Sequence, residues 1–152
     1  MNEEITRIQE SLLALLPLWN YKITKPFKQL LNEEISLEMY YCIQTLQWVG
    51  EPISMTELTQ FMRMPKQQMT KLVGRLVESG FVRRTYDAAD RRVIRLSVTD
   101  KAEEYIAKYL TEDAGDFRKL MEEMTEGDRE DFRGAVETLI RVLAKETCRV
   151  EE

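Results

Sequence analysis

The sequence predicts a mainly α-helical fold with one small β-hairpin, an α+β architecture. Apolar residues recur at steps of three and four over most of the 152 residues, which is the period of an amphipathic helix. Residues 81–98 differ, because two short runs rich in β-branched residues flank a polar turn there, as expected for a hairpin. Helices are therefore expected on both sides of the hairpin.

An amphipathic helix is expected at the N-terminus. Its apolar residues have nearly the spacing of a coiled coil: Ile5, Ile8, Leu12, Leu15 and Trp19. Pro17 lies inside this pattern and is expected to kink or end the helix, because proline has no N–H to donate. Pro26 marks a second kink or break.

The next two helices lie between clear start and stop signals. Ser36, with an acidic residue two positions later, can cap a helix that runs to about Trp48. Residues 50–52, Gly-Glu-Pro, break the chain, and a short helix is expected over residues 55–62.

A helix with a polar, partly basic face follows. Pro65 suits its first turn, where a missing N–H costs nothing, and Gly80 suits the position after its end. The inward stripe is Met69, Leu72, Val73, Leu76 and Val77. The opposite face presents Gln67, Lys71, Gly74, Arg75 and Glu78, with Gln68 and Thr70 on its flanks.

The hairpin is expected to have strands at residues 81–86 and 92–98, with Arg91 and Arg92 near its tip. Thr99 or Asp100 can then cap a long helix of about 24 residues. A turn is expected at residues 125–128, and a last amphipathic helix follows it.

The composition, 43% hydrophobic and 32% charged, is that of a soluble globular protein. The longest apolar run, residues 12–16, is far shorter than the roughly 18 residues that a membrane span needs. An acidic N-terminus, unlike a secretory signal, and only two cysteines favour the reducing cytoplasm. We therefore expect a cytoplasmic protein without a membrane partner.

No catalytic constellation is present. The sequence has no histidine, so the commonest general base and the commonest metal ligand are both absent. It also has no Walker-type phosphate loop, no CxxC pair and no GxSxG motif. We expect no enzymatic activity, no metal and no cofactor.

Basic residues concentrate between residues 62 and 95. This segment holds nine basic and three acidic residues, a net charge of +6, although the whole chain carries −5. A basic patch on an acidic body is typical of a focused polyanion site, because the local potential steers binding. Charge alone leaves an ordinary solvated surface as an equal alternative.

The order of the elements indicates a winged helix-turn-helix domain, flanked by N- and C-terminal helices. The major groove of B-DNA, about 12 Å wide, admits one α-helix, and the hairpin beside it can send a side chain into the minor groove. The flanking helices carry more apolar surface than a single chain readily covers, which predicts a homodimer.

The chain resembles the MarR family of bacterial regulators. The segment DRRVIRLSVT at residues 90–99 fits the family's wing signature, D-x-R-x-x-x-L-x-[LV]-T, at every specified position. The segment TKLVGRLVESGFVRR at residues 70–84 is similar to the family's recognition helix and first wing strand. The resemblance covers nearly the whole chain, most weakly over the first 30 residues.

This resemblance implies a repressor that binds a pseudo-palindromic operator in double-stranded DNA as a homodimer. The recognition helix then enters the major groove and the wing arginine the minor groove. Arg92 matches the signature arginine, and Asp90 matches the aspartate that orients the wing arginines by charge-assisted hydrogen bonds. The candidate DNA-binding residues are Lys66, Gln67, Gln68, Thr70, Lys71 and Arg75 on the helix and Arg84, Asp90, Arg91 and Arg92 on the wing.

By the same resemblance, residues 1–152 form a single MarR-type domain. Residues 1–32 are expected to form the N-terminal dimerisation region, residues 33–99 the winged lobe and residues 100–152 the C-terminal dimerisation helices. A winged-helix protein-interaction module without sequence-specific DNA binding is the alternative function. Such a module would not need a positive face on the wing and recognition helix.

An effector site is a further hypothesis. MarR-family relatives often bind small aromatic or amphipathic compounds between the dimer helices and the DNA-binding lobe. Trp19, Tyr40 and Tyr41 are the candidates for such a pocket, with core and dimer packing as the alternative. Cys42 raises the hypothesis of a peroxide sensor, and a buried, inert thiol is the alternative that we favour.

Overall fold

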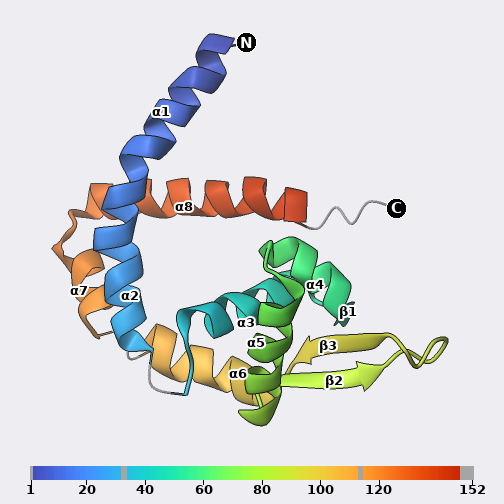
Figure 1. Ribbon diagram of the computed structural model, residues 1–152. Coiled ribbons are helices and arrows are strands. Elements are labelled where there is room, and N and C mark those ends of the chain that lie inside the picture. The colour runs from blue at the N-terminus through green and yellow to red at the C-terminus, as the bar shows by residue number, and fades with distance from the viewer. Residues whose placement is uncertain (1, 32–33, 113–114, 148–152) are drawn as a thin grey trace.

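The computed structural model describes residues 2–31, 34–112 and 115–147. The helices are α1 (Asn2–Trp19), α2 (Lys25–Leu30), α3 (Leu37–Val49), α4 (Met55–Met62), α5 (Lys66–Glu78), α6 (Asp100–Tyr105), α7 (Gly115–Glu123) and α8 (Glu126–Thr147). Two π-helical segments, η1 (Asn20–Thr24) and η2 (Ile106–Glu112), and three strands, β1 (Ile53–Ser54), β2 (Val82–Tyr86) and β3 (Ile94–Val98), complete the fold. Figure 1 shows α1 and α8 on one side of a lobe that holds α3 to α6, with the β2–β3 hairpin projecting from it. The predicted mainly helical winged-helix architecture is confirmed.

The N-terminal helix does not end at Pro17. It continues to Trp19, and the chain then widens into η1 before α2 begins with Pro26 in its first turn. Because each proline lacks an N–H, the regular ladder of helical hydrogen bonds is interrupted on both sides of η1. The predicted kink therefore takes the form of a π-helical segment.

The helices α3 and α4 have the predicted bounds to within a residue. Ser36 Oγ accepts the N–H of Met39 at 3.2 Å, and Gly50, with φ of +73°, ends α3 in the left-handed region. Ser54 Oγ accepts the N–H of Glu57 at 3.2 Å at the start of α4. Caps are local signals, so the sequence predicts these boundaries well.

The sheet is antiparallel, in the order β1-β3-β2, so β2 is an edge strand. β2 pairs with β3 along the full five residues of each strand, and Ile53 of β1 pairs with Leu96. The predicted hairpin is confirmed, but its second strand begins at Ile94 rather than at Arg92. The two-residue strand β1 is too short to leave a periodic pattern, and the sequence does not predict it.

The core of the lobe fixes the rotation of α5 about its axis. Met69, Leu72, Val73 and Leu76 are buried, as predicted, in one cluster with residues of α3, α4 and the sheet. Each fully buried side chain of this size contributes roughly 1.5–3 kcal/mol relative to an exposed one. The opposite face of α5 is thereby directed to solvent.

The long helix predicted after the hairpin is not continuous. Thr99 caps α6, its Oγ1 accepting the N–H of Ala102 at 3.4 Å, but the helix widens into η2 after Tyr105. Residues 113 and 114 of the predicted helix lie outside the described residues, and α7 follows them. Over so few residues, the spacing of apolar side chains does not distinguish an α-helix from a π-helical segment such as η2. At the predicted turn, Thr125 Oγ1 accepts the N–H of Asp128 at 3.1 Å at the start of α8.

The apolar stripes of α1 and α8 remain exposed in the single chain. Ile8 and Leu12 on α1 are 53% and 49% exposed, and Leu139 and Ile140 on α8 are 41% and 48% exposed. Contiguous apolar surface of this kind usually marks an interface. Over the described ranges, no helix combines the length and the apolar character that a membrane crossing requires.

Candidate nucleic-acid interface

The outward face of α5 presents long polar and basic side chains. Lys66, Gln67, Lys71 and Arg75 are all exposed, and they lie opposite the buried stripe of the same helix. Gln67, Lys71 and Arg75 follow one another at steps of four residues, so they form one row along the helix. This row presents hydrogen-bond donors and two positive charges to solvent.

The first turn of α5 is open to an anion. Pro65 precedes the helix and provides no side-chain cap, so the first N–H groups of α5 have no side-chain acceptor at the cap position. The positive end of the helix dipole lies at the same place, and it favours a phosphate. Arg63, in the turn before it, is exposed and has a left-handed φ of +49°.

Two of the predicted contact residues already have partners within the chain. Gln68 Nε2 donates to Glu38 Oε1 of α3 at 3.4 Å, and Thr70 Oγ1 donates to the Lys66 carbonyl at 2.9 Å. Both side chains are exposed beside the outward row. Gln67 is therefore the better-placed glutamine for a base edge.

Asp87 closes the wing. Its Oδ1 accepts the N–H groups of Ala89 and Asp90 at 2.8 and 3.2 Å, and its Oδ2 accepts Arg95 Nε at 2.8 Å. The bond from Arg95 and the two backbone bonds hold the pKa of Asp87 below its ordinary value, so this carboxylate is charged at neutral pH. These bonds brace the turn between β2 and β3.

Asp90 and Arg92 form the wing tip. Asp90 Oδ1 accepts the backbone N–H of Arg92 at 3.1 Å and lies 3.5 Å from the Arg92 Nε. The Arg92 side chain is 95% exposed, so it projects from the tip into solvent beside Asp90. Arg91 is exposed beside it. The wing tip therefore carries two exposed arginines, Arg91 and Arg92, on a turn that the Asp87 and Asp90 carboxylates hold in place.

Arg84 extends the basic surface along the edge strand. It lies opposite Leu96 in the register of the sheet, on the same side of β2 as Tyr86. Both side chains are exposed, and Tyr86 is 69% exposed. All of the predicted interface residues therefore lie on α5 or on the hairpin, within one lobe.

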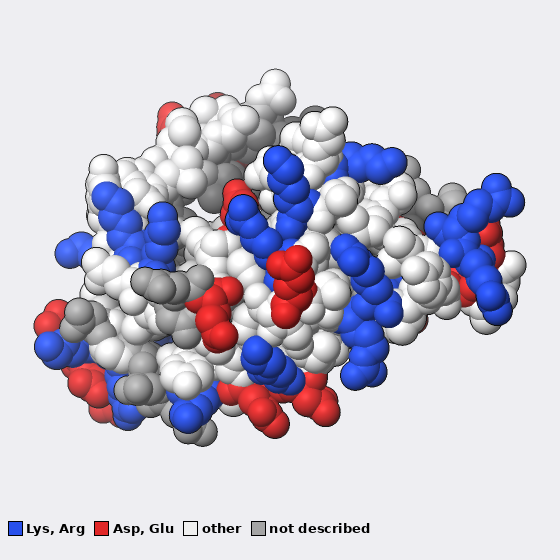
Figure 2. Space-filling view, turned by 60° about the horizontal axis from the view of Figure 1, so that its bottom comes forward, with Lys and Arg blue, Asp and Glu red and all other residues white. Residues whose placement is uncertain are grey.

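Basic side chains lie on the lobe and at its wing tip. Figure 2 shows lysine and arginine side chains spread across one face with acidic side chains among them, and a second basic group, also with acidic atoms beside it, at the projecting wing tip. The segment from residue 62 to residue 95 carries +6, and the rest of the chain carries −11. Such a separation focuses a positive potential on one surface of an acidic protein.

The three predicted pocket residues lie together. Trp19, Tyr40 and Tyr41 line a cavity of about 320 Å³ with seven further residues: Ile23, Thr24, Phe27, Ile106, Leu110, Thr111 and Phe117. The Phe27 and Tyr40 ring centroids are 4.8 Å apart. Burial and the neighbouring Tyr41 raise the pKa of Tyr40, so its hydroxyl stays protonated at neutral pH, and it donates to Gln44 Oε1 at 3.3 Å. The cavity is therefore aromatic with a few polar groups, as small-molecule sites generally are.

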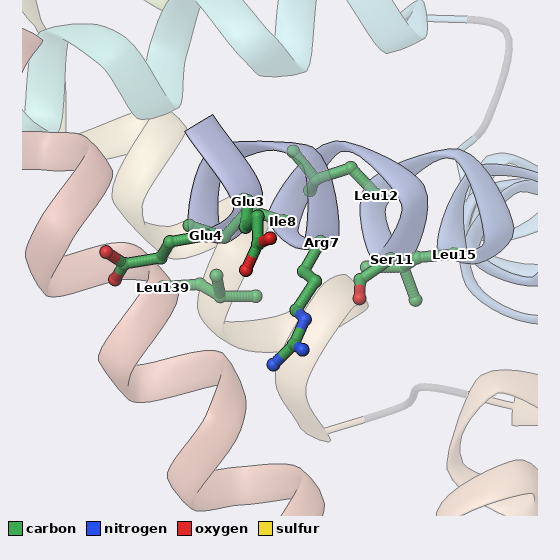
Figure 3. A pocket seen from close by; sticks show the side chains of 8 residues that line it. All are labelled: Glu3, Glu4, Arg7, Ile8, Ser11, Leu12, Leu15 and Leu139. Carbon is green, nitrogen blue, oxygen red and sulfur yellow. The ribbon is translucent and has the colours of Figure 1, made fainter. Parts of the chain in front are cut away.

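A second, larger hollow of about 650 Å³ separates α1 from α8. Figure 3 shows the residues that line it, of which Leu139 belongs to α8 and the others to α1: Glu3, Glu4, Arg7, Ile8, Ser11, Leu12 and Leu15. Its walls belong to the exposed apolar stripes, so this hollow is part of the same uncovered surface.

Cys42 is fully buried, and burial raises the pKa of its thiol to about 12. The reactive thiolate is then absent at neutral pH, which favours the inert alternative. Cys148 lies outside the described residues.

Sequence reasoning missed two parts of these sites. Asp87 and Arg95 brace the wing, but the ion pair joins residues eight positions apart across a hairpin whose register the sequence does not reveal. The cavity walls on η2 and α7 were also missed, because four separate segments meet there. The polar turn has an acidic residue at each end, Asp87 and Asp90, and this pattern is the signal from which the bracing of the wing could have been predicted.

Comparison with known proteins gives a consistent result. Residues 47–93 match the sequence model of the MarR family, and no curated protein matches the chain. Among solved structures, YusO from Bacillus subtilis is 21% identical with a TM-score of 0.63, over 93% of this chain and 97% of that one. Apo MarR from E. coli is 16% identical with a TM-score of 0.68, over 84% of this chain and 94% of that one. A mutant MarR complexed with operator DNA is 18% identical with a TM-score of 0.58, over 86% and 96% of the two chains.

Proposed function

We propose that this chain is a DNA-binding transcriptional repressor. The premise is that its fold and its segment 47–93 are of the MarR winged-helix type. The protein acts in the cytoplasm as a homodimer on a pseudo-palindromic operator, with α5 in the major groove and the wing tip in the adjacent minor groove. The observation that carries this proposal is that the outward face of α5 and the wing tip both present exposed basic side chains within a segment of net charge +6. The mutant MarR crystallised with operator DNA gives a precedent for this fold on DNA.

Each part of the surface has a distinct role in this proposal. Gln67 reads a base edge from the start of the recognition helix, while Lys66, Lys71 and Arg75 bind phosphates or guanine. Arg92 enters the minor groove, and Arg84 and Arg91 bind the backbone on either side of it. Gln68 and Thr70 hold the first turn in place through their present hydrogen bonds.

Selection from a pool of random duplexes tests the function and the reading residue together. The wild-type chain is expected to enrich a pseudo-palindrome whose half-sites are one helical turn apart. Gln67→Ala is expected to lower the affinity by roughly 1–3 kcal/mol per half-site and to relax the preference at one position. Gln68→Ala is expected to have the smaller effect, because its amide is bonded to Glu38.

Gln29→Ala, at an exposed glutamine of α2 outside the interface, is the matched control. An equal loss of affinity by Gln67→Ala on the enriched and the scrambled duplex would show that Gln67 does not read sequence. Failure of the wild type to enrich any sequence would contradict the function itself.

The aromatic cavity is proposed as the effector site. A planar or phenolic compound fits its volume and its ring-lined walls, and the Tyr40 oxygen, whose proton is donated to Gln44 Oε1, can accept a hydrogen bond from a phenol. Such a compound acts only if it binds the DNA-free geometry of the dimer better than the DNA-bound one.

Quenching of Trp19 fluorescence measures this binding in a Trp48→Phe background, where Trp19 is the remaining tryptophan. We expect active compounds to quench Trp19 and to release operator DNA over the same concentration range. A panel of planar and phenolic compounds that produces neither effect would remove the effector from the proposal.

A further inference from the structure

The end of the recognition helix is held by two residues at the start of α6. Lys101 Nζ donates to the carbonyl of Ser79, and Thr99 Oγ1 donates to the carbonyl of Gly80, both at 2.6 Å. The backbone N–H of Thr99 donates to the carbonyl of Phe81 at 3.1 Å. Three successive carbonyls after α5 are therefore bonded from one short segment.

Lys101 is well suited to this position. Its ammonium lies 5.0 Å from the centroid of the Phe81 ring, and its stem lies 3.5 Å from where a side chain at Gly80 would begin. Gly80 has φ of +80° and gives the chain its left-handed turn at this point. A cation here also lies at the negative end of the α5 dipole.

The same segment reaches the aromatic cavity. α6 continues directly into η2, and Ile106, Leu110 and Thr111 of η2 line that cavity. A row of rings runs alongside, because Tyr105 lies 5.5 Å from Phe81 and 5.0 Å from Tyr109 between ring centroids. One stretch of chain thus touches the recognition helix at one end and the cavity at the other.

η2 is the part of this stretch whose backbone conformation can change. A π-helical turn contains an extra residue and interrupts the regular ladder, and such turns are frequent at functional sites. A change in the filling of the cavity can therefore shift α6 relative to α5 without unfolding either helix.

We propose that Lys101 is a positioning residue for the recognition helix, and that with Thr99 it couples the occupancy of the aromatic cavity to the orientation of α5. The inference rests on the proposed function, since it names the route by which the effector site acts on the DNA-binding surface. Lys101 itself touches neither the cavity nor DNA in this account; it acts through the end of α5.

A double-mutant cycle tests the coupling without any ligand. Leu110→Trp fills the cavity from η2, and Lys101→Met removes the ammonium while keeping an unbranched apolar stem against Phe81. Hydrogen exchange at the amides of Ser79, Gly80 and Phe81 is one readout, and affinity for the selected duplex is the other. Thr111→Trp, at an exposed residue of the same wall, replaces Leu110→Trp if that variant does not fold.

The expected pattern is non-additive. Leu110→Trp speeds exchange at the three amides and weakens DNA binding about fivefold or more in the wild-type background, as typical couplings between sites do. In the Lys101→Met background it has little further effect on either readout. Lys101→Arg retains the donor and the charge, and it is expected to behave as the wild type.

Two controls separate positioning from direct binding. Lys108→Met removes an exposed lysine farther along the same stretch, and it is expected to leave both readouts unchanged. Lys101→Met should weaken DNA binding with an unchanged salt slope, whereas a lost phosphate contact lowers the slope by about 0.9. Additive effects in the cycle, or wild-type exchange in Lys101→Met, would overturn the proposal. The exchange arm does not depend on DNA, so it remains informative even if the wild type binds no specific sequence.

Discussion

Replacing Arg92 by alanine is expected to lower the affinity for operator DNA by roughly 1.5–3 kcal/mol per half-site, the range for hydrogen bonds to charged groups. The side chain is 95% exposed at the wing tip, and its Nε lies 3.5 Å from a half-exposed Asp90 carboxylate. The narrow minor groove of A·T-rich DNA concentrates negative potential, so the loss should be largest where the flanks are A·T-rich. A dimer loses two arginines, and the salt slope should flatten by about 0.9 for each phosphate neutralisation lost.

The melting temperature separates this role from a structural one. An exposed ion pair of this kind contributes at most about 1 kcal/mol to folding, so Arg92→Ala should melt with the wild type. Arg118→Ala is the matched control, because Arg118 is an exposed arginine on α7 with its own pair, Glu122, outside the basic surface. Unchanged affinity and salt slope in Arg92→Ala would show that the wing tip does not meet DNA.

A combined Leu12→Glu and Leu139→Glu variant is expected to be monomeric at micromolar concentration, whereas the wild type sediments as a dimer. Leu12 and Leu139 line the hollow between α1 and α8 and are 49% and 41% exposed in the single chain. A second copy would bury them, and burying unpaired carboxylates costs far more than leaving the subunits apart. A monomer can bind only one half-site of the operator, so the affinity of the variant should be orders of magnitude lower than that of the wild-type dimer.

Ala14→Glu places the same charge on the other side of α1 and should leave the dimer intact. Sedimentation equilibrium measures both variants, and circular dichroism checks that their helix content is unchanged. A wild-type chain that sediments as a monomer at micromolar concentration and ordinary salt would contradict the dimer.

The sequence predicts most of the lobe because its signals are local. Ser36, Ser54 and Thr99 each cap a helix through a bond three residues away, and Gly80 ends the recognition helix through its own φ. The buried stripe of α5 fixes which of its side chains point outward. The helix positions of the candidate interface could therefore be named before the fold was known.

The parts that sequence reasoning misses depend on distant contacts. The strand β1 exists because Ile53 pairs with Leu96, more than forty positions later in the chain. The Asp87–Arg95 pair depends on the register of the hairpin, and the cavity depends on how the stretch from α1 to α2 meets α3, η2 and α7. η2 leaves no distinct apolar period, so it was predicted as part of one long helix, whereas η1 lies where the sequence predicts a kink or break between Pro17 and Pro26.

The most direct test of the central claim is the equilibrium affinity of the wild-type chain for its selected duplex and for a scrambled duplex of the same composition. Both titrations use one physiological salt concentration, because the phosphate contribution depends steeply on salt. The selected duplex is expected to bind at least about 10³-fold more tightly than the scrambled one, the lower end for sequence-specific regulators. Equal affinity for the two duplexes would contradict the proposed function, because a repressor must bind its operator more tightly than other sequences.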